Sequence, residues 1–166
     1  HCSNVVGEVN DVPRICRMVR RAGACSCVDG VAYAPHGLPD IGRLGADIYL
    51  FSTYKCYGPH QGVMVVRNGL ARRLPHQGHD DEAGADWARF TPAGPDHAQI
   101  AACAGIADYI DALYPHHTKA GRDVAGRAAA IHDAMRARDA DLLRPLMSWL
   151  EDRRDLRILG PRSARR

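Results

Sequence analysis

The alternation of apolar runs with one helical pattern in the first seventy residues constrains the fold most. Asp11 is a good N-cap and Pro13 suits the first helical turn, so a helix is predicted to begin there. Strands that alternate with helices are typical of an α/β layer with a mostly parallel sheet and flanking helices. The predicted elements are a helix from Asp11 to Gly23, a strand at 24–28, a helical turn at 40–44, and strands at 48–52 and 62–66.

The second half of the chain has a different pattern. A connection at 75–96, rich in Pro and Gly with an acidic cluster at 80–82, is long enough to predict a functional loop or a partner contact. From His97 apolar residues recur at helical spacing, and we expect Pro115 to break that helix. The remaining predicted elements are helices at 122–138 and 141–151 and an edge strand at 156–159, which would open a second, smaller domain.

The composition excludes several classes. With 22 Lys and Arg against 19 Asp and Glu, the net charge of +3 is too small to argue for nucleic-acid binding. No run of 18 apolar residues is present, so we expect no membrane span. The chain starts at His1 without a methionine, and its first residues look like the end of a strand. We therefore expect it to be a segment of a longer protein.

Six cysteines show no regular spacing. Cys25 and Cys27 are separated by one residue, which is not the spacing of a zinc knuckle. We therefore expect the cysteines to be small core residues rather than metal ligands, so no metal site is predicted. Free thiols are typical of a reducing compartment, and we expect the protein to be cytoplasmic.

Three chemically useful groups fall at the predicted ends of neighbouring strands. Asp29 follows the first strand, and Ser52 and Lys55 lie at the end of the second. A lysine that forms an imine, a carboxylate for the pyridine nitrogen and a hydroxyl for the phosphate are what pyridoxal 5'-phosphate (PLP) requires. Taken separately, each signal is weak, because an Asp-Gly pair is most often a turn and Ser-x-x-Lys is common.

The segments around these residues make the combination specific, because together they resemble class V aminotransferases, and within them the cysteine desulfurase-like branch. The likeness runs in order from residue 1 to about 70, and 87–160 resemble the helical passage into that family's small domain. The segments that carry it are His1-Cys2-Ser3-Asn4-Val5-Val6-Gly7, Val28-Asp29-Gly30, Ala34-Pro35-His36, Leu44-Gly45-Ala46-Asp47 and Phe51-Ser52-Thr53-Tyr54-Lys55-Cys56-Tyr57-Gly58-Pro59.

The resemblance implies a role for five residues. Lys55 would be the catalytic Schiff-base lysine, Asp29 would pair with the pyridine nitrogen, and Ser52 would bind the phosphate. Asn4 matches an asparagine near the cofactor oxygen and the substrate carboxylate. Tyr54 replaces the histidine typical of cysteine desulfurases, and its hydroxyl would still reach the phosphate, as in the similar kynureninases.

Other positions depart from the family pattern. Ala32 stands where cysteine desulfurases carry a glutamine, and the segment from Thr91 to Pro95 lacks a clear glycine-threonine pair for the neighbouring subunit's phosphate. His36 matches a recurrent position, for which we favour a structural hydrogen bond. Cys56 is adjacent to Lys55, but we expect it to be a packing residue rather than a nucleophile.

The resemblance also implies an architecture and an activity. The chain would form part of a fold-type I PLP-dependent transferase, with the second half of the large domain at 1–96, and connecting helices and the start of a small α+β domain at 97–166. The activity would be cysteine desulfurase-like (C–S lyase or sulfurtransferase) or that of a class V aminotransferase, on an amino-acid substrate, in a homodimer. The alternatives are a transaminase, an epimerase, a kynureninase-like hydrolase, or a non-catalytic dimerising fragment; the fragment alone is expected to be inactive.

Overall fold

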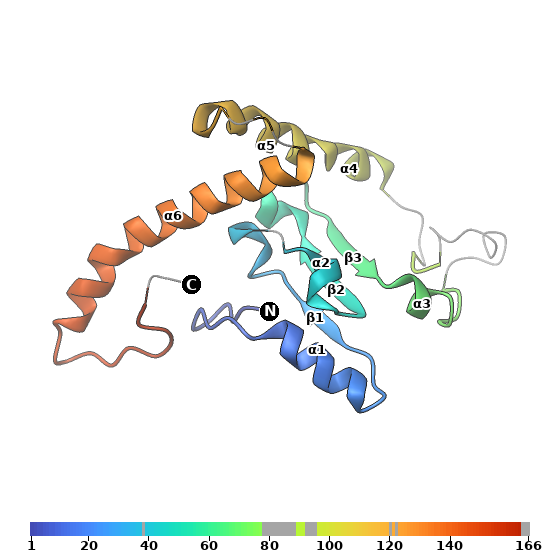
Figure 1. Cartoon of the computed structure of the whole chain (residues 1–166), viewed down its shortest axis with the longest axis horizontal. Helices are drawn as coiled ribbons and strands as arrows, with labels where there is room; N and C mark the ends of the chain where they lie inside the picture. Colours follow the sequence, from blue (N-terminus) through green and yellow to red (C-terminus); the bar gives the residue numbers. More distant parts are fainter. Residues whose placement is uncertain (38, 78–88, 92–95, 120, 122, 164–166) are drawn as a thin grey trace.

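A three-stranded sheet forms the centre of the chain in its computed structural model (Figure 1), which describes residues 1–37, 39–77, 89–91, 96–119, 121 and 123–163. The strands are β1 (Cys27–Asp29), β2 (Ile48–Ser52) and β3 (Gly62–Val66), in that spatial order. The predicted second and third strands have the observed bounds, whereas the first begins three residues later than expected.

The directions of the strands follow from the lengths of their connections. β1 and β2 are parallel, with Asp29 opposite Leu50, and the connection between them contains a helix. β2 and β3 are antiparallel, with Ser52 opposite Gly62. A parallel pair needs a crossover of a dozen or more residues, and the short segment 53–61 cannot supply one. The described sheet is therefore mixed, where the sequence predicted a mostly parallel one.

Local capping explains the first two helices, α1 (Val12–Arg21) and α2 (Ile41–Leu44). Asp11 accepts a hydrogen bond from the Arg14 N–H at 3.0 Å, and Asp40 accepts one from the Arg43 N–H at 3.1 Å. Each carboxylate satisfies an amide that has no partner within its helix. Val12 and Cys16 of α1 are buried against Ala46, which leads into β2, so α1 is fixed beside the sheet.

Three helices follow the sheet: α4 (His97–Ala102), α5 (Ala104–His117) and α6 (Val124–Glu151). Ile110 and Tyr114 of α5 pack on Ile131 of α6 to form a second core cluster. In Figure 1 the strands lie between α1 and the α5–α6 pair. The pair reaches the loops that follow the strands, because Ile106 of α5 lies beside Gly58 and Arg136 of α6 lies beside Gly37.

Several predicted helix bounds in this region were wrong. The helix predicted from His97 is interrupted at Cys103, which separates α4 from α5. Pro115, the predicted break, lies inside α5, which continues to His117. The two helices predicted at 122–138 and 141–151 are one helix, α6, with Pro145 inside it. A proline removes one backbone donor, but the Ala, Leu and Arg residues around it are strong helix formers, and here they continue the helix.

The segment after α6 forms no strand, so the edge strand predicted at 156–159 was wrong. Figure 1 shows this segment turning back towards the N-terminal loop. Gly160 adopts φ 121°, and a side chain there would collide with the Val6 carbonyl. The backbone at Gly160 therefore lies directly against the N-terminal loop, without forming the predicted strand.

Two predictions for the middle of the chain have different outcomes. The turn expected at Asn68-Gly69 is the start of a short helix, α3 (Asn68–Ala71). Most of the connection predicted at 75–96, with its acidic cluster, lies outside the described residues. Among the helices that the structure describes, none has the length and apolar character needed to cross a membrane.

Candidate functional site

Asp29 and Ser52 close two adjacent parallel strands at the same edge of the sheet. Asp29 is the last residue of β1 and Ser52 is the last of β2. The backbone N–H of Gly30 donates to the Leu50 carbonyl at 2.7 Å, which extends the ladder to the point where both chains leave the sheet. Ligands of open α/β sheets bind beyond the carboxyl ends of the strands. This edge is therefore the candidate site.

Tyr54 and Lys55 are placed at this edge by the 3₁₀ helix η2 (Thr53–Cys56), which follows β2 directly. Lys55 is exposed and makes no hydrogen bond or ion pair with the described residues. The Ser52 side chain precedes η2 without capping it, so its hydroxyl is available to a ligand. The Ser52 hydroxyl and the Lys55 amine thus belong to residues three positions apart in the sequence.

The turn that carries Asp29 is fixed by the surrounding packing. The Asp29 carboxylate is exposed and accepts a hydrogen bond from the Val31 N–H at 2.8 Å. Gly30 lies directly against the ring of Tyr49, and a side chain at this position would collide with it. Tyr49 is completely buried, and its burial raises the pKa of its hydroxyl, which therefore remains protonated.

His1 belongs to this region as well, although its sequence position alone predicted no individual role for it. Its ring stacks on Tyr33 with centroids 3.6 Å apart, and its Nδ1 lies 3.0 Å from the Tyr49 hydroxyl. Its backbone nitrogen donates to the Asp29 carbonyl at 2.6 Å. The N-terminal loop is thereby held beside the end of β1. No sequence signal points to this contact beyond the place of His1 at the start of the family-like segment.

Asn4 lies on the N-terminal loop, whose ends are joined by a β-bridge between Cys2 and Val9. The Ser3 hydroxyl accepts hydrogen bonds from the Val5 and Val6 amides, both at 3.3 Å. The Asn4 side chain is exposed and makes no hydrogen bond to any described residue. The structure thus brings Asp29, Ser52, Tyr54 and Lys55 to one sheet edge, whereas no hydrogen bond joins Asn4 to them.

The cysteine prediction was partly wrong. Cys16 and Cys56 are buried, as expected for core residues, but Cys25 and Cys27 are exposed because β1 begins only at Cys27 and lies at the edge of the described sheet. Burial raises the pKa of the Cys56 thiol, which is the behaviour expected of a packing residue. All six thiols are free, and the described residues contain no cluster of three or more metal-ligating side chains.

His36 connects the candidate site to α6. It ends the 3₁₀ helix η1 (Ala34–His36), and its Nδ1 lies 3.0 Å from the Asp139 carboxylate of α6. Its carbonyl also accepts a hydrogen bond from Arg136 at 3.2 Å. These contacts agree with the structural role predicted for His36. Thr91 to Pro95 is the segment where the family pattern has its glycine-threonine pair, and the structure describes only Thr91 of it.

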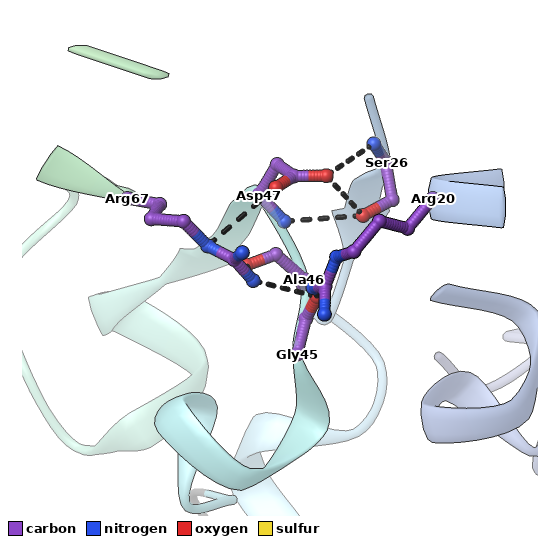
Figure 2. Close-up of polar contacts among 6 residues, drawn as sticks. All are labelled: Arg20, Ser26, Gly45, Ala46, Asp47 and Arg67. Atoms are coloured by element: carbon purple, nitrogen blue, oxygen red, sulfur yellow. Dashed lines mark hydrogen bonds and ion pairs between the residues drawn. The ribbon is translucent and has the colours of Figure 1, made fainter. Parts of the chain in front are cut away.

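A polar cluster lies at the opposite edge of the sheet, where the sequence patterns predicted none. Figure 2 shows Asp47 accepting hydrogen bonds from the Ser26 N–H at 2.9 Å and the Ser26 hydroxyl at 3.0 Å. Arg67 lies 3.5 Å from the other carboxylate oxygen, and Arg20 donates to the Gly45 carbonyl at 2.6 Å. The Ser26 N–H bond is the main reason that the pKa of Asp47 lies below its ordinary value. The cluster therefore joins the starts of β1 and β2 to the end of β3, and Lys55 lies beyond the other end of β2.

Comparison with known proteins gives the class V aminotransferases, the family that the sequence resembles. The model of the family described as Aminotransferase class-V matches residues 1–83. The aminotransferase-like protein FGM3 of Gibberella zeae is 45% identical over 80 residues, which cover 48% of this chain and 20% of that protein. A probable cysteine desulfurase of Pseudomonas putida is 31% identical over 170 residues, which cover 95% of this chain and 38% of that protein.

The fold is also found in a solved structure, that of the cysteine desulfurase CsdA from Escherichia coli. The TM-score is 0.68 at 21% identity, and the alignment covers 98% of this chain and 40% of that one. The chain thus has the α/β fold of that protein, the fold-type I architecture predicted from the sequence. It belongs to the class V aminotransferase family. It spans between a fifth and two fifths of the length of these relatives.

Proposed function

We propose that this chain carries the lysine half of a PLP site in an enzyme that acts on an amino acid. The observation that carries the proposal is the position of Lys55. Its amine is exposed, has no partner among the described residues, and follows a strand whose parallel neighbour ends at Asp29. An amine without an ion pair is available for covalent attachment, and the nearby strand end supplies the carboxylate.

The residues present fit the chemistry of this cofactor. Lys55 would bind it covalently and move a proton at the substrate α-carbon. Asp29 would hold the ring nitrogen, since its carboxylate is exposed and its turn is fixed against Tyr49. Ser52 and Tyr54, whose hydroxyls make no hydrogen bond to described residues, would hold the phosphate. When bound, the cofactor would supply an electron sink for the substrate carbanion.

Asn4 is assigned by family membership rather than by contacts. Its exposed amide lies on the loop that His1 fastens to the end of β1, and we propose that it faces the cofactor oxygen and the substrate carboxylate. The domain division at 96 and 97 is proposed on the same basis. A homodimer is proposed for the full-length protein because family members build their sites at a subunit interface.

The reaction we favour is cysteine desulfuration or a class V aminotransferase reaction. The relatives named cysteine desulfurase and aminotransferase-like protein support these two. Ala32 and Tyr54 differ from the residues typical of desulfurases, so a transaminase, an epimerase or a kynureninase-like hydrolase is the second candidate. Release of sulfide and alanine from cysteine by the full-length protein would identify desulfuration, whereas amino transfer to a keto acid would identify a transaminase.

The attachment residue is tested by reduction of the PLP-loaded full-length protein with borohydride, followed by peptide mapping. We expect the adduct on Lys55 and its loss in Lys55→Ala. Lys119→Ala is the matched control within this chain, because Lys119 is its only other lysine and lies outside the candidate site. An adduct elsewhere, or no adduct in a folded full-length protein, would contradict the proposal.

A further inference from the structure

His60 stacks on Tyr54, the residue proposed above to bind the cofactor phosphate. The two ring centroids are 4.8 Å apart and the ring planes differ by only 5°. Tyr54 is 47% exposed, and its hydroxyl makes no hydrogen bond to any described residue. Among the hydrogen bonds and ring contacts of the described residues, the stack on His60 is the one that Tyr54 makes, and it orients the Tyr54 ring.

The loop that carries His60 is itself firmly held. Thr53 is buried, and its hydroxyl donates to the Pro59 carbonyl at 2.6 Å while lying 3.0 Å from the Gln61 carbonyl. The Thr53 N–H also donates to the Gln61 carbonyl at 2.8 Å. These bonds fix the residues on both sides of His60 to the start of η2. The imidazole is thus presented to Tyr54 from a fixed backbone.

The chain reverses direction between the two rings at Tyr57. Tyr57 adopts φ 67°, the left-handed conformation that is uncommon for a residue with a side chain. The Gly58 N–H then donates to the Thr53 carbonyl at 2.9 Å. This tight return brings position 60 back beside position 54, so the stack is a consequence of the backbone path.

We propose that His60 is a positioning residue that orders the Tyr54 ring for the phosphate end of the cofactor. An exposed tyrosine that must be ordered on binding loses side-chain freedom, and a preformed stack removes part of that cost. The proposal rests on the proposed PLP site. It adds that the affinity for the phosphate depends on a ring outside the set of cofactor ligands.

Three variants of the full-length protein separate the ring contact from the chemistry of the imidazole. His60→Ala removes the stack, His60→Phe keeps an aromatic ring, and Tyr54→Phe keeps the stack but removes the hydroxyl. The probes are PLP and pyridoxal, which lacks the phosphate, measured by equilibrium binding with inorganic phosphate as a competitor. The NMR signals of the Tyr54 ring in the cofactor-free protein report the stack directly.

We expect His60→Ala to weaken PLP binding about two- to tenfold, the range for one aromatic pair, and to leave pyridoxal binding unchanged. His60→Phe should restore the affinity, and His60→Ala should have no effect once Tyr54→Phe is present. The Tyr54 ring signals should shift in His60→Ala and less in His60→Phe.

Two results would overturn the inference, and a third would overturn the proposed function on which it rests. Unchanged discrimination between PLP and pyridoxal in a folded His60→Ala protein that still binds PLP would show that the stack does not order Tyr54. Binding by His60→Phe as weak as by His60→Ala would show that the imidazole contacts the phosphate itself. Wild-type protein that binds no PLP would overturn the proposed function, a separate failure that the first titration detects.

Discussion

Ser26 and Asp47 form a reciprocal pair across 21 residues of sequence. Two hydrogen bonds run from Ser26 to the Asp47 carboxylate, at 2.9 Å and 3.0 Å, and the Asp47 N–H donates to the Ser26 hydroxyl at 3.1 Å. Ser26 is buried, and it immediately precedes β1 while Asp47 precedes β2. This pair sets the register with which the two parallel strands begin, at the edge opposite the candidate site.

Ser26→Ala is expected to lower the free energy of unfolding by about 1.5–3 kcal/mol, because it removes a hydrogen bond to a mostly buried carboxylate. Ser52→Ala is the matched control, since the Ser52 side chain makes no capping bond, and its effect should stay within about 0.5 kcal/mol. Urea denaturation followed by circular dichroism measures both. A loss in Ser26→Ala no larger than the loss in Ser52→Ala would mean that the Ser26 hydroxyl contributes nothing to stability.

Gly30→Ala should destabilise the protein through its contact with Tyr49. The added methyl group would collide with a ring that is completely buried, and overpacking of this kind costs about 1–3 kcal/mol. Gly62→Ala is the control, because a side chain at Gly62 meets open space and should change stability by less than about 0.5 kcal/mol. A Gly30→Ala protein as stable as Gly62→Ala, by thermal denaturation, would refute the close packing.

Cys56 is expected to resist alkylation in the folded protein. It is only 4% exposed, and burial raises its pKa, so that little thiolate is present near neutral pH. Iodoacetamide at mildly alkaline pH, followed by peptide mass spectrometry, should modify the exposed Cys25 quickly and Cys56 only after unfolding. Modification of native Cys56 as fast as Cys25 would reopen its role as a nucleophile.

His132 should make stability fall as the solution is acidified. Burial, with a smaller effect of the Arg136 charge, lowers its pKa below the ordinary value of 6.5, against an opposing effect of Asp133. The unfolded chain therefore binds a proton first, and stability present above pH 6.5 is lost as the pH falls towards the folded-state value. The free energy of unfolding, measured by urea denaturation, should therefore change less between about pH 7.5 and 5 in His132→Gln than in the wild-type protein.

The exposed His116 provides the control for this pH dependence. His116→Gln should keep the slope of the wild-type protein over the same interval. A wild-type profile that is flat, or a slope that survives in His132→Gln, would assign the acid sensitivity to another group.

The candidate site was predicted from the sequence to the extent that its residues follow strand ends. Asp29, Ser52 and Lys55 are predicted to lie at one edge because parallel strands end together, and the structure has that arrangement; Tyr54 was a candidate only through the family resemblance. Their roles remain predictions. The stack of His60 on Tyr54 was not foreseen, because it depends on the path of the loop after η2 rather than on residue type.

Local signals determined the elements of this protein. Asp11 and Asp40 cap helices through bonds to amides three residues away, so a few neighbouring residues are enough to fix where those helices begin. The second and third strands have the predicted bounds for a similar reason, since their apolar runs stop at turn residues. The order of predicted helices and strands along the chain was therefore enough to predict the α/β class.

The tertiary structure decided what distant segments do to one another. No short window of sequence predicts the continuity of α6 through Pro145, the antiparallel direction of β3 or the link from His36 to Asp139, 103 residues apart. These features depend on packing and connection geometry, in which contacts between remote residues outweigh local preferences. The sequence by itself predicted a role for Lys55, whereas the place of its amine beside a strand end, with no partner among the described residues, is a property of the fold.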